Sequence, residues 1–453
     1  MIFDYIVLDK EGKIPLCTQL YQGIQQAIEQ ENLKVGEQLP SIRVAAKELA
    51  VSRTTVETAY IRLCNAGYVK SRPQSGYVVE SGYRIPPLFG AIEESRAYTY
   101  DFSSRQMDKR AADTARWQTY VRQALRETDT LLSYGAPQGE TALREAIAQY
   151  SYRTRGVTAQ PEQILIGAGM QSLLMLFCSL YPKRAVVALD APVLKQAERI
   201  FSDFGFRTVA VSGYKKQPIS EQLIQNKADL YFYTPSVYRK KTLNTHRAFL
   251  EDICAWAEAK PTRFVLEDDY NGELRYTARP TPAIQAQSPQ HVVYLGSFSK
   301  LLLPSVRIAY AVLPYTLLEA YQSRAALYNP TASKLEQLAL AAYIRDGALE
   351  KHLRRLRKLY AEKSKTLAKA LEKTFGTELE HLSILETSLS VVVHLKTALS
   401  DENIKARAER AGIHLQKIEK QHLWLSFSGM PTEEIPSAVK ALHEALKEER
   451  HSV

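Results

Sequence analysis

A lysine stands just after an apolar run of this 453-residue sequence, at a place where its amine could act as a nucleophile. The run Val292-Val293-Tyr294-Leu295 continues into Gly296-Ser297-Phe298-Ser299-Lys300, so we expect Lys300 at the end of a strand, facing a cleft. Desolvation there lowers the pKa of an ammonium group and frees the amine for a Schiff base. Arg307, seven residues later, carries a fixed positive charge that could hold a phosphate. A lysine after a strand is nevertheless more often a surface residue.

Two further segments carry groups of complementary chemistry. Glu267-Asp268-Asp269-Tyr270 ends another apolar run, and there a carboxylate could keep a pyridine nitrogen protonated while a phenol bonds a ring oxygen. Gly167-Ala168-Gly169-Met170-Gln171 is expected to turn from a strand into a helix, with backbone N–H groups that suit an anion. Alone, an acidic pair is more often a helix cap and a small-residue turn only a turn. Pyridoxal 5′-phosphate (PLP) needs an amine, a carboxylate, a phenol and phosphate ligands, and their order at strand ends predicts PLP as cofactor.

The elements that would position these groups follow an α/β pattern from about Asp101 onward. Short apolar runs suited to buried parallel strands occur at 164–167, 185–189, 230–233, 264–267 and 292–295. Helical stretches such as 248–259 lie between them. After about Leu340 come a long helical segment, strands near 391–393 and 424–427, and a terminal helix. We therefore predict a large α/β domain followed by a small C-terminal α+β subdomain.

The first 80 residues predict a separate winged helix-turn-helix, joined through a linker at 81–100 to a domain at 101–453. A first helix has the apolar positions Leu20, Ile24, Ala27 and Ile28. Ser41 can cap a second short helix, and a third runs over 54–65. Two short strands at 68–72 and 76–79 would form the wing. The apolar positions of the third helix expected to face the core are Val56, Tyr60, Ile61 and Leu63.

The third helix begins at Ser52-Arg53-Thr54-Thr55, and such N-terminal residues read base edges in the major groove of DNA. Arg53 can donate a bidentate pair to guanine, while Thr54 and Thr55 can reach a phosphate or a thymine methyl group. The other residues expected to contact DNA, on the preceding helix and the wing, are Arg43, Lys70, Arg72 and Gly76. Residues 33–80 carry a charge of only +3, seven basic against four acidic side chains. Charge alone would favour a small helical domain with a solvated face.

The pattern of residues 40–68, Pro-Ser-x-Arg through Val-Ser-Arg-Thr-Thr-Val to Gly-Tyr, resembles the winged helix of the GntR family of bacterial regulators. The rest resembles the fold-type I aminotransferase-like domain of the MocR (GabR-like) subfamily, on motifs at 134–139, 143–144, 155–157, 267–276 and 297–307. The resemblance implies that Lys300 forms the Schiff base with PLP, Asp268 holds the pyridine nitrogen and Tyr270 contacts O3′. The phosphate would be held by Arg307, Gly169 and Met170, with Tyr134 from a neighbouring subunit. It also implies a head-to-tail homodimer that binds operator DNA.

The sequence also departs from that family. Residues 191–194 read Ala-Pro-Val-Leu where an aromatic usually stacks on the cofactor ring, and Lys240-Lys241-Thr242 replaces a Pro-Thr-Gly stretch. The strand that supplies an arginine for a substrate carboxylate reads Leu423-Trp424-Leu425-Ser426. Without that charge-assisted contact, worth ~1.5–3 kcal/mol, transaminase turnover is not expected unless another cation such as Arg239 substitutes.

We therefore predict a PLP-dependent transcriptional regulator that senses PLP, or an amino compound reacting with it, and controls genes of vitamin B6 or amino acid metabolism. The competing hypotheses are an aminotransferase with an accessory DNA-binding head, and a regulator without cofactor. A basic run, residues 351–358, could face DNA or the pocket entrance, or could be a solvated helix face paired with Glu350 and Glu362.

Composition narrows the class of protein further. The net charge of +10 admits a polyanionic partner but does not select one. The four cysteines are far apart and no histidines are spaced for a metal pair, so zinc and disulfide frameworks are not expected. No secretory signal and no apolar stretch of the ~20 residues of a membrane span are present, which predicts a cytoplasmic protein.

Overall fold

The computed structural model describes residues 6, 8–10, 12, 14–72, 76–80, 98–103, 106–190, 194–212, 217–235, 243–276, 282–415 and 417–447. The chain divides into two compact units, Met1–Arg96 (the head) and Ala97–Val453 (the large unit). Most of the linker expected at 81–100 lies outside the described residues. Tyr100 already belongs to a strand of the large unit, β4 (Tyr100–Asp101).

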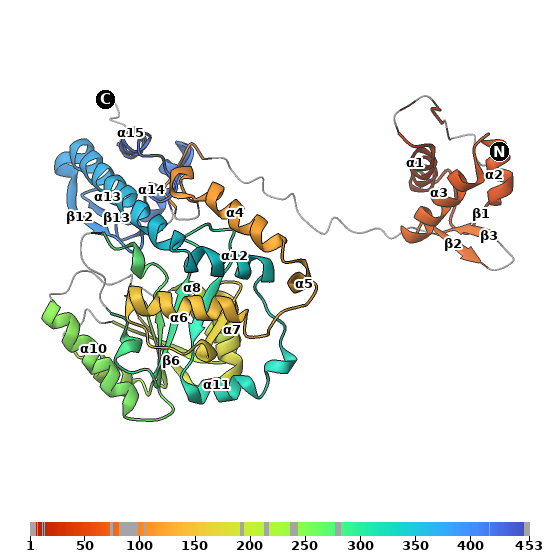
Figure 1. Cartoon of the computed structure of the whole chain (residues 1–453). Helices are drawn as coiled ribbons and strands as arrows, with labels where there is room; N and C mark the ends of the chain where they lie inside the picture. Colours follow the sequence, from red (N-terminus) through yellow and green to blue (C-terminus); the bar gives the residue numbers. More distant parts are fainter. Residues whose placement is uncertain are drawn as a thin grey trace, which may run out of the picture. The chain divides into compact units, whose positions relative to one another are not determined.

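The head contains the expected three helices and wing (Figure 1). Its helices are α1 (Leu16–Glu29), α2 (Ile42–Glu48) and α3 (Arg53–Asn65), and its strands are β1 (Gln38–Leu39), β2 (Val69–Arg72) and β3 (Gly76–Val79). The strands form an antiparallel sheet in the order β1-β3-β2, of which β1 was not predicted. The hydroxyl of Ser41 accepts a hydrogen bond from the Val44 N–H at 3.4 Å, which confirms the predicted cap of α2.

The core of the head confirms the apolar pattern of α1, because Leu20, Ile24, Ala27 and Ile28 are all buried. On α3, Val56, Tyr60 and Leu63 are buried as expected. The prediction for Ile61 is wrong, since its side chain is 49% exposed. Ile61 directly follows Tyr60, and successive helix positions differ by about 100°, so it points away from the face that packs on α1.

The large unit is built on a seven-stranded sheet in the order β5-β11-β10-β9-β8-β6-β7. All neighbouring strands pair in parallel except β11, which runs antiparallel to β5 and β10. The five strands predicted from the apolar runs are confirmed, and β7 and β11 are additional. The strand bounds are β5 (Ile164–Gly167), β6 (Val186–Asp190), β7 (Arg207–Val211), β8 (Leu230–Tyr233), β9 (Phe264–Asp268), β10 (Val292–Ser297) and β11 (Ala309–Val312).

Helices cover both faces of this sheet (Figure 1). One face is buried by α6 (Thr141–Arg155), α9 (Ile219–Gln225), α10 (Leu243–Glu258) and α12 (Lys334–Arg345), with α4 (Thr114–Leu125) packed on α12. The other is buried by α7 (Met170–Leu180), α8 (Lys195–Asp203) and α11 (Tyr315–Gln322). A short helix α5 (Thr128–Leu131) and the 3₁₀ turns η1 (Lys109–Ala111), η2 (Pro161–Gln163), η4 (Gly272–Leu274), η5 (Ile284–Ala286) and η6 (Ala325–Leu327) lie between them.

The C-terminal part forms the expected small α+β subdomain. The long helix α13 (Ala348–Phe375) leads into an antiparallel sheet in the order β12-β13-β16-β15. Its remaining elements are η7 (Gly376–Glu378), β12 (Leu379–Leu385), β13 (Ser390–Leu395), α14 (Asp401–Arg410), β14 (Ile413–His414), β15 (Lys417–Glu419), β16 (His422–Ser426) and α15 (Ile435–Leu446). Strand β14 pairs in parallel with β4. Among the helices in the described part of the chain, none has the length and hydropathy that crossing a membrane requires.

Candidate functional site

The register of the sheet brings the predicted cofactor residues to one edge. Gly167 of β5 lies opposite Ala309 of β11, and Ala309 lies opposite Ser297 of β10. Asp268 of β9 pairs with Leu295, two residues before Ser297. Because β11 is antiparallel, the residues that precede it lie at the edge where the parallel strands end. We call this the carboxyl edge, and it is where open α/β sheets bind ligands.

Lys300 follows β10 at the carboxyl edge. Its side chain is half-buried, and burial lowers the pKa of its ammonium group. A lower pKa raises the fraction of neutral amine at a given pH, and the neutral amine is the nucleophile. The turn that carries it is held by a hydrogen bond from the Ser299 N–H to the Ser297 hydroxyl, 3.3 Å long.

Asp268, the last residue of β9, is 2% exposed. Its Oδ1 has no hydrogen-bond partner among the described residues. Burial, assisted by the neighbouring charge of Asp269, raises the pKa of Asp268 to about 7. A buried carboxylate oxygen without a donor costs free energy, so this atom fits a ligand that brings its own donor, such as a protonated ring nitrogen.

The turn between β5 and α7 is shaped for an anion. Gly169 caps the N-terminus of α7 with a φ of +98°, a conformation that glycine adopts without strain. A Cβ at this position would lie 2.6 Å from Nη2 of Arg307, so the absence of a side chain lets the guanidinium lie against the turn. Met170 opens the helix. A fixed cation beside the first N–H groups of an eleven-residue helix is a favourable phosphate site.

Arg307 contacts the turn that carries Lys300, Tyr270 follows the end of β9, and Tyr134 is exposed. The Arg307 side chain is exposed and donates from Nη1 to the Ser299 hydroxyl at 3.4 Å, on the lysine-bearing turn. Tyr270 follows β9 by two residues and is half-buried. The ring of Tyr134 is 91% exposed, which leaves it available to a second subunit.

Of the three departures from the family pattern, residues 240–242 lie outside the described residues, as does Arg239. Of residues 191–194, only Leu194 is described. The third is the strand β16, where Trp424 stands half-buried. The ammonium of Lys417 lies 4.3 Å from the centre of its ring. Strand β16 contributes no guanidinium, so no carboxylate clamp comes from it.

Sequence reasoning missed the buried layer behind Asp268. Asp269 is 1% exposed and forms an ion pair with Arg155, Nε to Oδ2 at 2.5 Å. The Tyr294 hydroxyl donates to the same oxygen at 2.9 Å. The sequence showed an arginine at a helix end and a second acid, but nothing in it indicated that these residues meet.

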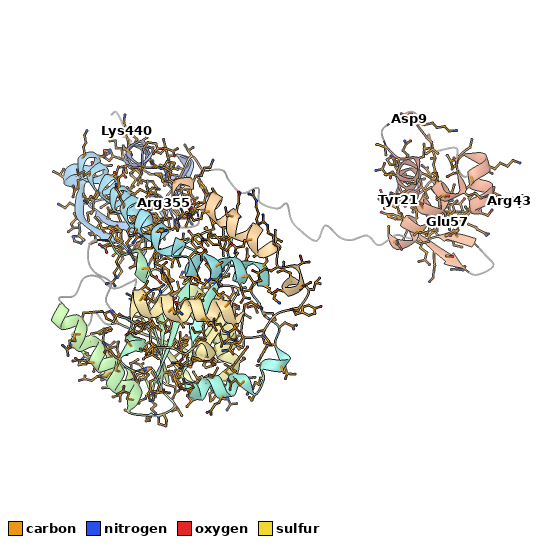
Figure 2. The ribbon with its side chains drawn as sticks, in the orientation of Figure 1. Asp9, Tyr21, Arg43, Glu57, Arg355 and Lys440 are labelled. Carbon is orange, nitrogen blue, oxygen red and sulfur yellow. The ribbon has the colours of Figure 1, made fainter. Side chains whose placement is uncertain are left out.

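The basic run 351–358 lies on α13, and its side chains fall into two groups, those bonded to neighbouring elements and those exposed. Arg357 donates from Nε to the Glu273 carbonyl at 2.7 Å. Arg355, labelled in Figure 2, donates to the Ala112 carbonyl at 3.2 Å. Glu350 pairs with Arg153 of α6 at 2.7 Å rather than within the helix. Lys351, Arg354 and Lys358 are exposed. Part of the run therefore fastens α13 to its neighbours.

In the head, the residues predicted to contact DNA divide into two groups. Ser52 caps α3, since its hydroxyl accepts from the Thr55 N–H at 3.1 Å and bonds the Thr55 hydroxyl at 2.8 Å. Both side chains therefore hold the helix start in place. Ser52 is also exposed. The other exposed residues among the predicted contacts are Arg43 (labelled in Figure 2), Arg53, Thr54, Lys70, Arg72 and Gly76. Lys70 lies 3.8 Å from Glu80, which offsets part of its charge.

Comparison with known proteins places both units in families. Residues 97–442 match the family described as aminotransferase class I and II, and residues 16–79 match the bacterial regulatory proteins of the gntR family. The chain is 31% identical to YdeL of Bacillus subtilis, an uncharacterized HTH-type transcriptional regulator, over 97% of this chain and 98% of that one. It is 28% identical to the probable rhizopine catabolism regulatory protein MocR of Rhizobium meliloti, with 92% and 89% covered.

Two further similarities concern pyridoxine and its derivatives. The chain is 26% identical to PdxR of Corynebacterium glutamicum, an HTH-type pyridoxine biosynthesis transcriptional regulator, over 83% of each chain. The fold is similar to the crystal structure of Pyrococcus horikoshii kynurenine aminotransferase in complex with PMP, with a TM-score of 0.66 and 21% identity over 79% of this chain and 93% of that one.

Proposed function

Because this chain belongs to the MocR-type bacterial regulators, in which an aminotransferase class I and II domain follows a GntR-type winged helix, we propose that it binds PLP at the carboxyl edge and changes its affinity for an operator in response. The chain is a DNA-binding transcriptional regulator, and the predicted fold class is confirmed. Its large unit has the fold of aminotransferases, which use PLP. The binding of PLP itself is our proposal.

The observation that carries the proposal is the buried Oδ1 of Asp268, which has no donor among the described residues and lies at the same edge as Lys300 and Arg307. The three groups are chemically different, and PLP has a matching group for each. Its ring nitrogen would provide a donor for Asp268, Lys300 would supply the amine for its aldehyde, and Arg307 would supply the cation for its phosphate. When bound, PLP supplies an aldehyde that condenses with amines and a ring that withdraws electrons.

Each protein group then has a definite task. Asp268 would accept a hydrogen bond from the protonated ring nitrogen, and Tyr270 would donate one to the ring oxygen. Arg307, with the backbone N–H groups of Gly169 and Met170, would neutralise the phosphate. Burial of Lys300 lowers the pKa of its ammonium group and so raises the fraction of neutral amine at a given pH. In a head-to-tail homodimer, the exposed Tyr134 would reach the phosphate of the neighbouring subunit.

The effector we propose is PLP itself or an amino compound that reacts with it. Strand β16 offers Trp424 instead of a guanidinium, so an amino acid gains no carboxylate clamp there, which favours PLP alone. PdxR, a relative, is a regulator of pyridoxine biosynthesis, and vitamin B6 genes are therefore our first choice of target, with amino acid metabolism the second. As the operator lies on the bacterial chromosome, we place the protein in the cytoplasm.

In the head, we propose that Arg53 and Thr54 contact base edges from α3 while Arg43 supplies a further contact from α2. Lys70, Arg72 and the backbone at Gly76 would approach the adjacent groove from the wing, and Ser52 and Thr55 would hold the start of α3 for the reading residues.

The test is a titration of a fluorescent operator fragment with the full-length protein, unloaded and loaded with PLP. A coupling of about 1–3 kcal/mol predicts an affinity change of about five- to 150-fold. Lys300→Ala should bind the operator but lose the response, whereas Lys365→Ala, an exposed lysine of α13, should keep it. Identical operator binding with and without PLP, together with a response to an amino acid, would exclude PLP as the effector. Steady turnover of an amino donor and a keto acid would instead identify an aminotransferase.

A further inference from the structure

Behind the carboxyl edge, three acidic side chains share the interior with the buried guanidinium of Arg155. Arg155 is 2% exposed, and Glu267, Asp269 and Glu273 are each 3% exposed or less. The Glu267 carboxylate accepts from the backbone N–H groups of Ile284 and Gln285 at 3.0 and 3.2 Å, and Glu273 accepts from the Tyr150 hydroxyl at 3.2 Å. Asp269 is therefore the acid that the structure pairs directly with Arg155.

Asp269 connects three elements of the large unit. Its backbone N–H donates to the Leu295 carbonyl of β10 at 3.0 Å. Its carboxylate accepts from the Tyr294 hydroxyl, also on β10, and pairs with Arg155 at the end of α6. A Cβ on Gly272 would collide with the Asp269 carboxylate, so a glycine at position 272 gives this carboxylate the space that it occupies. The end of β9 is thus fastened to β10 and α6 at one residue.

The residues that this connection holds in place are those proposed to contact PLP. Asp268 immediately precedes Asp269. Lys300 lies five positions after Leu295, whose carbonyl Asp269 bonds, and three positions past the end of β10. A ligand that touches both Asp268 and Lys300 requires a fixed separation between the ends of β9 and β10. If the end of β9 or of β10 shifts, Asp268 and Lys300 no longer contact the same ligand together. The ligand then loses its orientation even though both residues are present.

We propose that Asp269 is a positioning residue for PLP: through Arg155 and Tyr294 it fixes the ends of β9 and β10 so that Asp268 and Lys300 engage the same ligand. This inference rests on the proposed function, since it concerns how the same site is held. Asp269 itself does not touch the ligand. Its role differs from that of an ordinary buried ion pair because its loss should change the binding of PLP and not only the stability of the fold.

The charge of Asp269 adds a second effect on the site. Burial is the main reason that the pKa of Asp268 is raised to about 7, and the adjacent carboxylate of Asp269 raises it further. Removing the charge of Asp269 should therefore lower the pKa of Asp268. The titratable and charged groups that face this layer, from α6, β9, β10, β11 and η4, are Tyr150, Arg155, Glu267, Tyr294, Tyr310 and Glu273.

The experiment measures PLP binding by the full-length protein with absorption spectroscopy, over a pH series centred on about 7, the pKa of Asp268. Asp269→Asn keeps the shape of the side chain and removes its charge. We expect a rise of about tenfold or more in the dissociation constant for PLP, as for loss of one charge-assisted contact. The midpoint of its pH dependence should move to lower pH. Tyr294→Phe keeps every charge, so it should weaken PLP binding while the midpoint stays in place.

A matched control is Asp108→Asn, because Asp108 forms another buried ion pair of the large unit, with Lys363 at 2.6 Å. It should lower the melting temperature and leave PLP binding and the pH midpoint unchanged. If Asp269→Asn behaves like this control, the inference is wrong even though PLP binds. If the wild-type protein binds no PLP, the proposed function fails instead. Should Asp269→Asn not fold, an unchanged PLP affinity of Tyr294→Phe would overturn the proposal.

Discussion

Lys363 of α13 and Asp108 form an ion pair 2.6 Å long inside the large unit, and the lysine side chain is fully buried. The Lys363 ammonium also donates to the Met430 carbonyl at 2.6 Å, and the Asp108 N–H donates to the Ser428 carbonyl at 2.9 Å. The ion pair therefore fastens the beginning of the large unit to α13 and to the loop that follows β16.

Replacing one member of this pair should be costly. Lys363→Met leaves the Asp108 carboxylate buried without its cation, for which a loss of ~3–5 kcal/mol in unfolding free energy is expected. Denaturant unfolding of the large unit measures it. Lys365→Met, an exposed position on the same helix, should cost little, and equal losses for the two variants would contradict the prediction.

Gly169→Ala should weaken PLP binding. An alanine at a φ of +98° is strained, and its Cβ would lie 2.6 Å from the Arg307 guanidinium and push it away from the turn. The expected rise in the PLP dissociation constant is about tenfold, for a displaced charge-assisted contact. Gly205→Ala is the matched control, because Gly205 also has a positive φ, +84°, but no atom lies within 4 Å of its added Cβ. It should destabilise the fold without changing PLP affinity, and a similar loss of affinity in both variants would count against the phosphate site.

The protein without PLP should lose stability progressively as the pH rises from about 4 to about 8. Burial, with a contribution from Asp269, raises the pKa of Glu267 to about 8 and those of Asp268 and Glu273 to about 7. In the unfolded chain the pKa values of these carboxyl groups lie at ~4, so between pH ~4 and 8 the native state binds more protons than the unfolded state. The stabilisation from these extra protons is complete below pH ~4 and is lost above the native pKa values.

Thermal unfolding at a series of pH values tests this. Asp268→Asn removes one of the three titrations, so the difference in melting temperature between this variant and the wild type should grow as the pH rises. Glu362→Gln, an exposed site on α13, should give no such trend. A difference that is constant with pH for Asp268→Asn would show that its carboxyl group does not titrate in this range.

Arg53→Ala should reduce specific binding of DNA more than non-specific binding. A bidentate contact to guanine contributes ~1–3 kcal/mol of discrimination, which corresponds to a loss of operator affinity of about five- to 150-fold. Lys70→Ala, at a wing residue whose charge Glu80 partly offsets, should weaken operator and scrambled DNA equally and by less. Fluorescence anisotropy with both DNA fragments measures the ratio. Equal losses on both fragments for Arg53→Ala would place Arg53 on the phosphate backbone instead.

The sequence by itself determined the architecture and the chemical character of the site. Apolar runs of strand length, the apolar spacing of α1 and the cap at Ser41 are local signals, and the structure confirms them. Where a local signal was ambiguous, as for Ile61 beside Tyr60 on one helix turn, the pattern assigned both to the core and only one is buried. Lys300, an acid within residues 267–269 and the Gly169 turn were predicted from local context, because a polar residue after a buried strand is visible in the sequence, and the family resemblance selected Asp268.

Only the tertiary structure decided which of these groups meet and what holds them. Asp269 pairs with Arg155 across 114 positions of sequence, and Lys363 pairs with Asp108 across a still longer separation. A buried charge pairs with an opposite charge that the fold brings close in space, and the separation of the two residues along the sequence does not predict which pair forms. The antiparallel insertion of β11 likewise sets Arg307 at the carboxyl edge, since strand direction is fixed by pairing between strands and not by the residues of one strand.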